Sequence, residues 1–326
     1  MRKTTAVASV LGFTALALAG CASAPATAES CGREAVTGPA IDAIEVSGDF
    51  GPDLTVDAPA GFTAAGAAHS DIVPGDGRVI ESLGQGVALD LLFVDPATGA
   101  TVPMWGEPGS LTRIVTPSVV SEQMLPGIDE ALLCASEGTR MVATFGDDGV
   151  VPEFGAQVQQ VLQQVAVQQG NDGAETPDLS SIVAVIDVNR VLPASAEGSL
   201  VYNADSGMPR VVRDANGVPG VTIPAGSAPA EQETQTLIAG DGAEIAEGEL
   251  LTLQYTNVRW SSGSVANSTW QSDSPETATL EELPEGFAEA LEGATIGSQI
   301  LTVVPDGDGD ATVSVIDVLG AVPATE

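Results

Sequence analysis

The chain has 326 residues, a formal net charge of −35 at pH 7, 44% hydrophobic residues and 4% aromatic residues. Its length suffices for two domains with ordinary cores, and the hydrophobic content together with 37 Gly and 21 Pro indicates a globular, turn-rich protein rather than a disordered one. The strong negative charge argues against binding to nucleic acid and against electrostatic attachment to anionic lipid.

Residues 1–20 have the pattern of a secretion signal. Arg2 and Lys3 form a basic start, and the apolar run 6–19 is too short to span a bilayer. The run ends in Leu18-Ala-Gly-Cys21, which resembles a bacterial lipobox. We therefore predict a lipoprotein signal peptide over residues 1–20.

The lipobox resemblance implies cleavage before Cys21 and lipidation of that residue. The alternative is an ordinary secretory peptide cut near Ala24 or Ala28. With a lipid on Cys21, residues 21–39 are a tether, and the protein is expected outside the cytoplasm, attached to the cell membrane by the lipid alone.

The remaining cysteines are Cys31 and Cys134. Two thiols in an exported protein suggest one disulfide, which would fix the N-terminal arm to the first domain. The alternative is a buried, free Cys134 at a helix end.

The rest of the chain contains an internal repeat, because four landmarks recur in the same order. The matching pairs are Pro59-Ala-Gly61 with Pro224-Ala-Gly226, Gly75-Asp-Gly77 with Gly240-Asp-Gly242, Gly127–Leu132 with Gly286–Leu291, and Val185–Val188 with Val315–Val318. We infer a tandem duplication, with one domain at 40–192, a linker at 193–206 and a second domain at 207–321.

Each repeat predicts strands around one short helix. Apolar residues alternate along 87–93 and 251–255, as in half-buried strands. The segments 128–132 and 287–291 place apolar residues at helical spacing, and a closing strand follows in each unit. The predicted fold class is α+β, with an antiparallel sheet wrapped around one short helix in each domain. An apolar stripe in domain 1 predicts an inserted helix near 156–168.

Domain 2 contains a series of motifs in a fixed order, which are Gly240-Asp-Gly242, a strand with Tyr255, Gly263–Trp270, Leu283–Leu291 and Val315–Leu319. Domain 1 contains the similar segment Gln123–Leu132. The order of these motifs resembles that of the FKBP-type peptidyl-prolyl isomerases. The segment Val46–Phe62 also looks like the opening of actinobacterial lipoproteins that carry tandem domains of this kind.

This resemblance implies an apolar pocket that holds the proline ring. In domain 2 the implied substrate-binding residues are Tyr255, Asn267, Trp270, Leu283 and Phe287. In domain 1 they are Leu125, Ile128, Phe93 and Trp105. Ala266-Asn267 replaces the Phe-Asp pair of the family, and the loop before the last strand of domain 2 is reduced to Pro305–Asp310.

The implied activity is peptidyl-prolyl isomerisation by a folding factor at the cell surface, acting on Pro-containing segments of exported proteins. Such a reaction requires no covalent chemistry, cofactor or metal, and we expect a monomer. One alternative is a catalytically degenerate binding or chaperone module of the same fold. Another is a structural protein of the cell envelope.

Two further patterns have simpler explanations than a functional site. The only histidine, His69, lacks a nucleophile motif beside it and is predicted to lie at the surface. Asp306, Asp308 and Asp310 have the spacing of a calcium loop, but Ala311 stands where that loop requires Gly. We therefore predict a tight acidic turn at 306–310.

Overall fold

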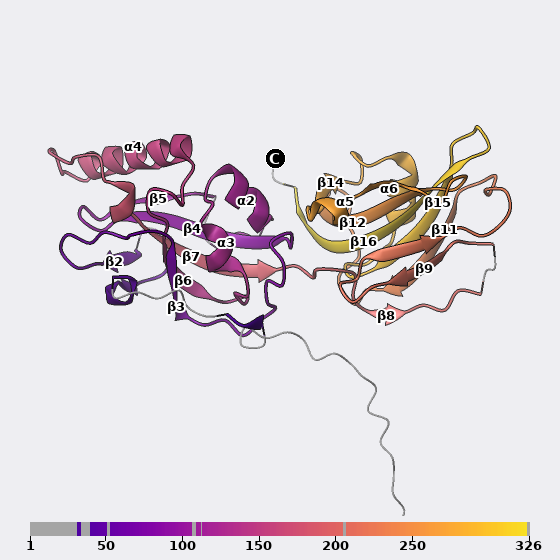
Figure 1. The fold of residues 1–326 in the computed structure, drawn as a ribbon, viewed down its shortest axis with the longest axis horizontal. Coiled ribbons are helices and arrows are strands. Elements are labelled where there is room, and N and C mark those ends of the chain that lie inside the picture. The colour runs from indigo at the N-terminus through magenta and orange to yellow at the C-terminus, as the bar shows by residue number, and fades with distance from the viewer. Residues whose placement is uncertain are drawn as a thin grey trace, which may run out of the picture.

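The computed structural model describes residues 31–33, 40–50, 53–105, 109–111, 113–204 and 207–324, which form two domains side by side along the long axis (Figure 1). The predicted leader, Cys21 and most of the tether 21–39 lie outside the described residues. Within the described part, no helix is long and apolar enough to cross a membrane.

Domain 1 is built on a five-stranded antiparallel sheet in the order β3-β6-β7-β4-β5. Its elements are η1 (Ile41–Ala43), β1 (Glu45–Ser47), β2 (Thr55–Asp57), β3 (Ala68–Val73), β4 (Val87–Asp95), β5 (Ala100–Pro103), α2 (Pro117–Gln123), α3 (Ile128–Leu132), β6 (Arg140–Thr144), α4 (Pro152–Gln168), η2 (Leu179–Ser181) and β7 (Val183–Val191).

Domain 2 is built on a seven-stranded antiparallel sheet in the order β13-β12-β16-β15-β11-β8, with β14 also paired to β12. Its elements are β8 (Ser199–Leu200), β9 (Arg210–Arg213), β10 (Pro219–Thr222), β11 (Glu233–Ala239), β12 (Glu249–Arg259), β13 (Val265–Ser268), α5 (Thr269–Ser272), β14 (Glu276–Thr279), α6 (Glu285–Leu291), β15 (Gln299–Pro305) and β16 (Ala311–Pro323).

The two sheets repeat one strand order. The path β3-β6-β7-β4-β5 of domain 1 corresponds to β11-β15-β16-β12-β13 of domain 2. The register agrees as well, since Leu91 lies opposite Ile186 and Tyr255 lies opposite Ile316. Both domains therefore have the same antiparallel α+β fold, and positions in one domain can be compared directly with positions in the other.

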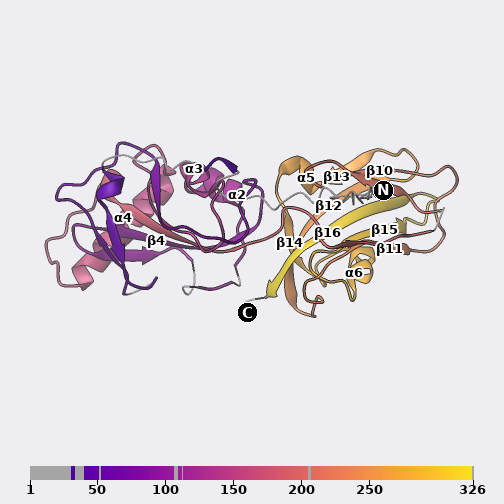
Figure 2. The same ribbon diagram turned by 90° about the horizontal axis from the view of Figure 1, so that it is seen from below.

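Both faces of each sheet are covered, one by helices and the other by a β-hairpin. In domain 1, Val46 and Val56 of the β1–β2 hairpin pack against Val142 and Val183 of the sheet. In domain 2, the β9–β10 hairpin packs in the same way over the face of β15 and β16 that points away from α6 (Figure 2). Because side chains alternate between the two faces, strands covered on both sides are nearly continuous apolar runs.

The helices differ from the expectation of one per domain. The predicted short helices are α3 and α6, but the structure adds α2 in domain 1 and the single turn α5 in domain 2. The inserted helix α4 begins at Pro152, before the predicted start at 156, because proline is favoured in the first helical turn.

The predicted linker 193–206 is not wholly a connection, since β8 within it pairs with the edge of β11. Just before it, Leu192 is 2% exposed and lies between the domains. A Cβ added to Gly86 of domain 1 or Gly320 of domain 2 would come within 3.0 or 2.9 Å of the Leu192 side chain. Glycine at these two positions therefore permits the close approach of the domains at Leu192.

Candidate functional site

The helix-covered face of domain 2 carries an aromatic pair. Tyr255 projects from β12, and Phe287 projects from α6 at a ring-centroid distance of 5.5 Å and an interplanar angle of 87°. This edge-to-face geometry is favourable for two aromatic rings. Tyr255 is half-buried, so part of its side chain remains open to solvent.

The hydroxyl of Tyr255 donates a hydrogen bond to the carboxylate of Glu276, which lies on the neighbouring strand β14. Burial first, and then the bond to Glu276 and its charge, raise the pKa of Tyr255 to about 12, while Asn267 opposes the shift. The phenol consequently stays protonated, as a hydrogen-bond donor, at every physiological pH. Glu276 had not been predicted as a site residue; its position becomes visible only from the β12–β14 register.

The other predicted residues of this site differ in their accessibility. Leu283 and Phe287 are each 7% exposed and belong to one apolar cluster with Leu253 and Ile316. Asn267 is exposed on β13, and its side chain accepts a hydrogen bond from Asn257 at 2.8 Å. The accessible part of the site is thus the Tyr255 ring with its polar neighbours, above a closed apolar base.

Trp270 does not join this group. It follows Thr269 on α5 and lines a cavity of about 510 Å³ together with Gln254 and with Gln85 of domain 1. Gln254 and Tyr255 are adjacent in β12 and therefore point to opposite faces of the sheet. The indole Nε1 of Trp270 is buried without a hydrogen-bond partner. The structure thus places this residue at the domain junction rather than at the Tyr255 site.

The corresponding face of domain 1 is closed. Leu125, Ile128 and Phe93 are 0%, 0% and 2% exposed and share one core cluster. Phe154 of α4 packs against Phe93 at a centroid distance of 6.0 Å. The inserted helix therefore supplies the side chains that fill this face, an outcome the Gln-rich sequence of the helix does not indicate.

Trp105, the last predicted site residue of domain 1, is half-buried against the same cluster. The guanidinium of Arg113 lies 5.8 Å from the centre of its ring, within reach of a cation–π interaction. Trp105 thus packs at the margin of the closed core.

The N-terminal arm docks on domain 1. Cys31 and Cys134 form a disulfide, and Arg33 makes a bidentate ion pair with Asp71 at 2.8 and 2.6 Å. The same guanidinium donates to the carbonyl oxygens of Ala131 and Leu133 at the end of α3. The arm is therefore held by one covalent bond and a nearly buried cation.

The prediction for His69 was wrong, because the residue is 2% exposed on β3. Burial, followed by the nearby Arg33, lowers its pKa, against the smaller effects of Asp71 and Glu130. The imidazole is thus neutral near pH 7 and serves as a core side chain. The Ala-rich sequence around it gave no sign that the N-terminal arm lies close by.

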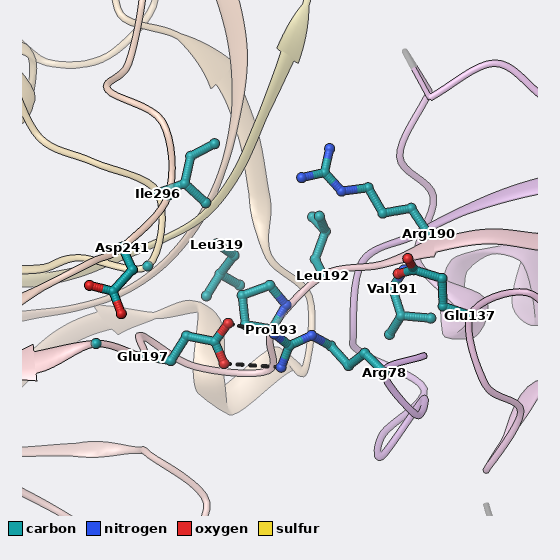
Figure 3. Close-up of a pocket in the computed structure, with 13 residues that line it drawn as sticks. Arg78, Glu137, Arg190, Val191, Leu192, Pro193, Glu197, Asp241, Ile296 and Leu319 are labelled. Carbon is teal, nitrogen blue, oxygen red and sulfur yellow. Dashed lines mark hydrogen bonds and ion pairs between the residues drawn. The ribbon is translucent and has the colours of Figure 1, made fainter. Parts of the chain in front are cut away.

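A second concave region lies between the domains, with a volume of about 500 Å³ (Figure 3). Arg78 of domain 1 donates to both carboxylate oxygens of Glu197 across it, at 3.0 and 2.5 Å. Glu137 and Arg190 of domain 1 and Asp241 of domain 2 complete its charged lining. Because the lining mixes both signs of charge and includes the connection 191–198, we attribute this cleft to the packing of the domains.

The acidic turn is formed as expected. Pro305 pairs with Ala311, and the Asp306 carboxylate accepts the backbone N–H groups of Asp308 and Asp310. Arg259 lies 3.1 and 3.3 Å from the carboxylates of Asp306 and Asp310. Among the described residues, no group of three or more His, Cys, Asp or Glu is arranged to hold a metal ion.

No protein-family model matches the chain. A curated relative, the "Probable FK506-binding protein" of Corynebacterium glutamicum, is 26% identical over 87 residues, which are 27% of this chain and 74% of the relative. The chain is thus related to the FKBP-type peptidyl-prolyl isomerases. It is an α+β protein with two domains of FKBP-like fold.

Solved structures give weaker likenesses. FkpA from Escherichia coli is 17% identical with a TM-score of 0.28, over 37% of this chain and 55% of that chain. The three FKBP domains of wheat FKBP73 are 13% identical with a TM-score of 0.31, over 79% of this chain and 96% of that chain. The putative peptidyl-prolyl cis-trans isomerase FKBP12 from Mycobacterium tuberculosis is 24% identical with a TM-score of 0.24, over 28% and 86%. These TM-scores are too low to define the fold, which follows from the strand order instead.

Proposed function

We propose that the protein is an extracytoplasmic folding factor whose second domain binds Pro-containing segments at Tyr255 and isomerises the X–Pro bond. The observation that carries this proposal is the half-buried Tyr255 ring, held edge to face against Phe287 above an apolar base. Domain 1, whose equivalent face is filled by α4, acts as a scaffold and carries the N-terminal arm.

The chemistry required is modest. Rotation about an X–Pro bond has a barrier of about 18–20 kcal/mol because the amide is conjugated. A surface that binds the twisted, less polar amide better than either planar form lowers that barrier without a nucleophile or metal. The Tyr255 ring and the apolar base offer contact to the proline ring. The phenol donates its one proton to Glu276, so its oxygen is left as an acceptor for an N–H group of the bound peptide.

The alternative function is a binding or chaperone module without useful catalysis. The observation in its favour is that Glu276 already accepts the Tyr255 hydroxyl, while Leu283 and Phe287 are almost fully buried. A proline ring then meets a shallow surface rather than a deep pocket. In this case the protein binds Pro-containing peptides but leaves their isomerisation rate unchanged.

Replacing Tyr255 by Ala distinguishes these functions. We expect the chain without its leader to accelerate X–Pro isomerisation, measured by NMR exchange on short peptides, and the Tyr255→Ala variant to lose at least about tenfold in kcat/KM, or about 1.4 kcal/mol of transition-state stabilisation. The matched control is Tyr202→Ala, since Tyr202 is 90% exposed in the connection that follows β8. Binding without acceleration supports the chaperone alternative, and equal acceleration by both variants contradicts the Tyr255 site.

We also propose that a lipid on Cys21 anchors the protein outside the cytoplasm. The lipobox-like Leu18-Ala-Gly-Cys21 supports this assignment. The wild-type chain made in a bacterium that processes lipoproteins is expected in the detergent phase of a cloud-point partition, and Cys21→Ser in the aqueous phase. A cut near Ala24 or Ala28, found by mass spectrometry of the mature N-terminus, would exclude the anchor.

A further inference from the structure

We propose that the Tyr255 site selects Pro-containing segments with a Lys or Arg beside the proline. This inference rests on the proposed function, because it names the substrate class of the same site. It is drawn from the carboxylate that contacts the Tyr255 hydroxyl and from the exposed carboxylates on the elements that carry the aromatic pair.

The elements that hold the aromatic pair also carry a set of exposed carboxylates, which we call the acidic rim. Its central member is Glu276 on β14, the strand that pairs with β12 next to Tyr255. The other members lie on the turn after β14 and on or just after α6, the helix of Phe287. The exposed residues of the acidic rim are Glu276, Glu281, Glu282, Glu289 and Glu292.

The part of the chain that carries the acidic rim has no positively charged residue to neutralise it. Residues 260–324 contain no Lys, Arg or His. Arg259 lies further along β12, opposite Thr312, and pairs with Asp306 and Asp310. Arg210 and Arg213 belong to the β9–β10 hairpin, which covers the other face of the sheet. The described cations of domain 2 are therefore engaged elsewhere or face away from Tyr255.

The contact between Tyr255 and Glu276 gives the rim a defined place to receive a cation. Oε2 of Glu276 accepts the phenol, and Oε1 has no hydrogen-bond partner within the described residues. An aromatic ring beside a carboxylate is a favourable environment for an ammonium or guanidinium group, which gains cation–π and charge-assisted contacts together. A proline on the Tyr255 ring places its neighbouring side chain within reach of this oxygen.

The test uses three peptides that differ only in the residue before proline, which is lysine, alanine or glutamate. NMR exchange gives the catalysed isomerisation rate of each with the chain lacking only its leader. We expect the lysine peptide to exceed the glutamate peptide by about tenfold in kcat/KM at low salt, as for an electrostatically focused site. The ratio should fall towards unity at about 1 M salt, where the screening length is about 3 Å.

A charge-neutral substitution in the rim gives the second measurement. Glu276→Gln keeps an acceptor for the phenol but removes the charge, and we expect it to reduce the lysine-to-glutamate ratio of kcat/KM at least about threefold. The ratio is the readout, because a general loss of activity lowers the rates of both peptides together. The matched control is Asp241→Asn, an exposed carboxylate of domain 2 at the domain junction, which should leave the ratio unchanged.

The outcomes separate the inference from the function beneath it. Equal acceleration of all three peptides, abolished by Tyr255→Ala, overturns the charge selection and leaves the isomerase intact. A full lysine preference in Glu276→Gln also contradicts the inference. Failure of every peptide to be bound or accelerated overturns the proposed function, and the substrate class with it.

Discussion

Replacing both Cys31 and Cys134 by Ser is expected to lower the free energy of unfolding of domain 1 by about 2–5 kcal/mol. The disulfide joins residues 103 positions apart, so its loss frees a long loop in the unfolded chain. The loss also releases the arm that places Arg33 against Asp71 and the end of α3. Urea unfolding at pH 7, followed separately for the two domains, measures the change.

A double-mutant cycle that combines Arg33→Ala with the two serine substitutions tests whether the disulfide and the ion pair stabilise domain 1 cooperatively. Arg33 has a side chain only 6% exposed, so its removal from the intact protein should cost about 1–3 kcal/mol through lost charged hydrogen bonds. In the double-serine background the arm is already undocked, and the same substitution should have almost no effect. Cys21→Ser is the matched thiol control. Additive losses would show that Arg33 docks without the disulfide.

The fold was accessible to sequence reasoning wherever a pattern was duplicated. Matching landmarks around Gly127 and Gly286, and around Asp187 and Asp317, carried the two-domain α+β interpretation, and the strand orders of the two sheets agree with each other in the same way. The covering hairpins were missed because strands of three or four residues are too short for a reliable alternation signal. The pairing of β8 was missed for the same reason.

Less of the candidate site could be predicted from the sequence, because contacts between residues on different strands and helices determine which side chains form it. The family motif identified Tyr255, Leu283 and Phe287, which the structure brings into one cluster. The motif could not show that α4 fills the face of Phe93, nor that Glu276 meets the Tyr255 hydroxyl. Trp270 matched the motif in sequence but lies at the domain junction. A motif fixes the element that carries a residue, whereas register and insertions fix which residues meet.

Asp187 and Asp317 occupy the same position in the last strands of the two domains, but their hydrogen-bond partners differ. In domain 1, Arg140 forms a bidentate ion pair with Asp187 at 2.7 and 2.6 Å. In domain 2 the equivalent partner is Gln299, whose amide donates to Asp317 at 2.7 Å. The backbone N–H of Ala196 from the interdomain connection donates to the other oxygen. Asp317 is 0% exposed, so a charged carboxylate there has polar but neutral direct partners.

The burial of Asp317 predicts that its contribution to the free energy of unfolding decreases as the pH rises, whereas the contribution of an ion-paired carboxylate increases. Burial raises the pKa of Asp317 to about 6, against the lowering effects of Ala196, Gln299 and Arg213. Because the folded pKa lies above the ordinary value of 3.8, the contribution of Asp317 favours folding at pH 4 and is lost as the pH rises through 6. The loss amounts to about 3 kcal/mol, at 1.36 kcal/mol for each unit of pKa.

The Asp317→Asn variant isolates this contribution from the other 44 acidic residues, which titrate in both proteins. Asn at position 317 can accept only one of the two hydrogen bonds from Ala196 and Gln299. This loss is the same at every pH. The informative quantity is therefore the change with pH in the difference between the free energies of unfolding of the two proteins. We expect the free energy of unfolding of the wild type, relative to Asp317→Asn, to fall by about 2 kcal/mol between pH 4 and pH 7, because the rest of the full difference is already lost at pH 4. Chemical denaturation at several pH values measures it, and a flat difference would mean that Asp317 titrates in the folded protein as it does in the unfolded chain.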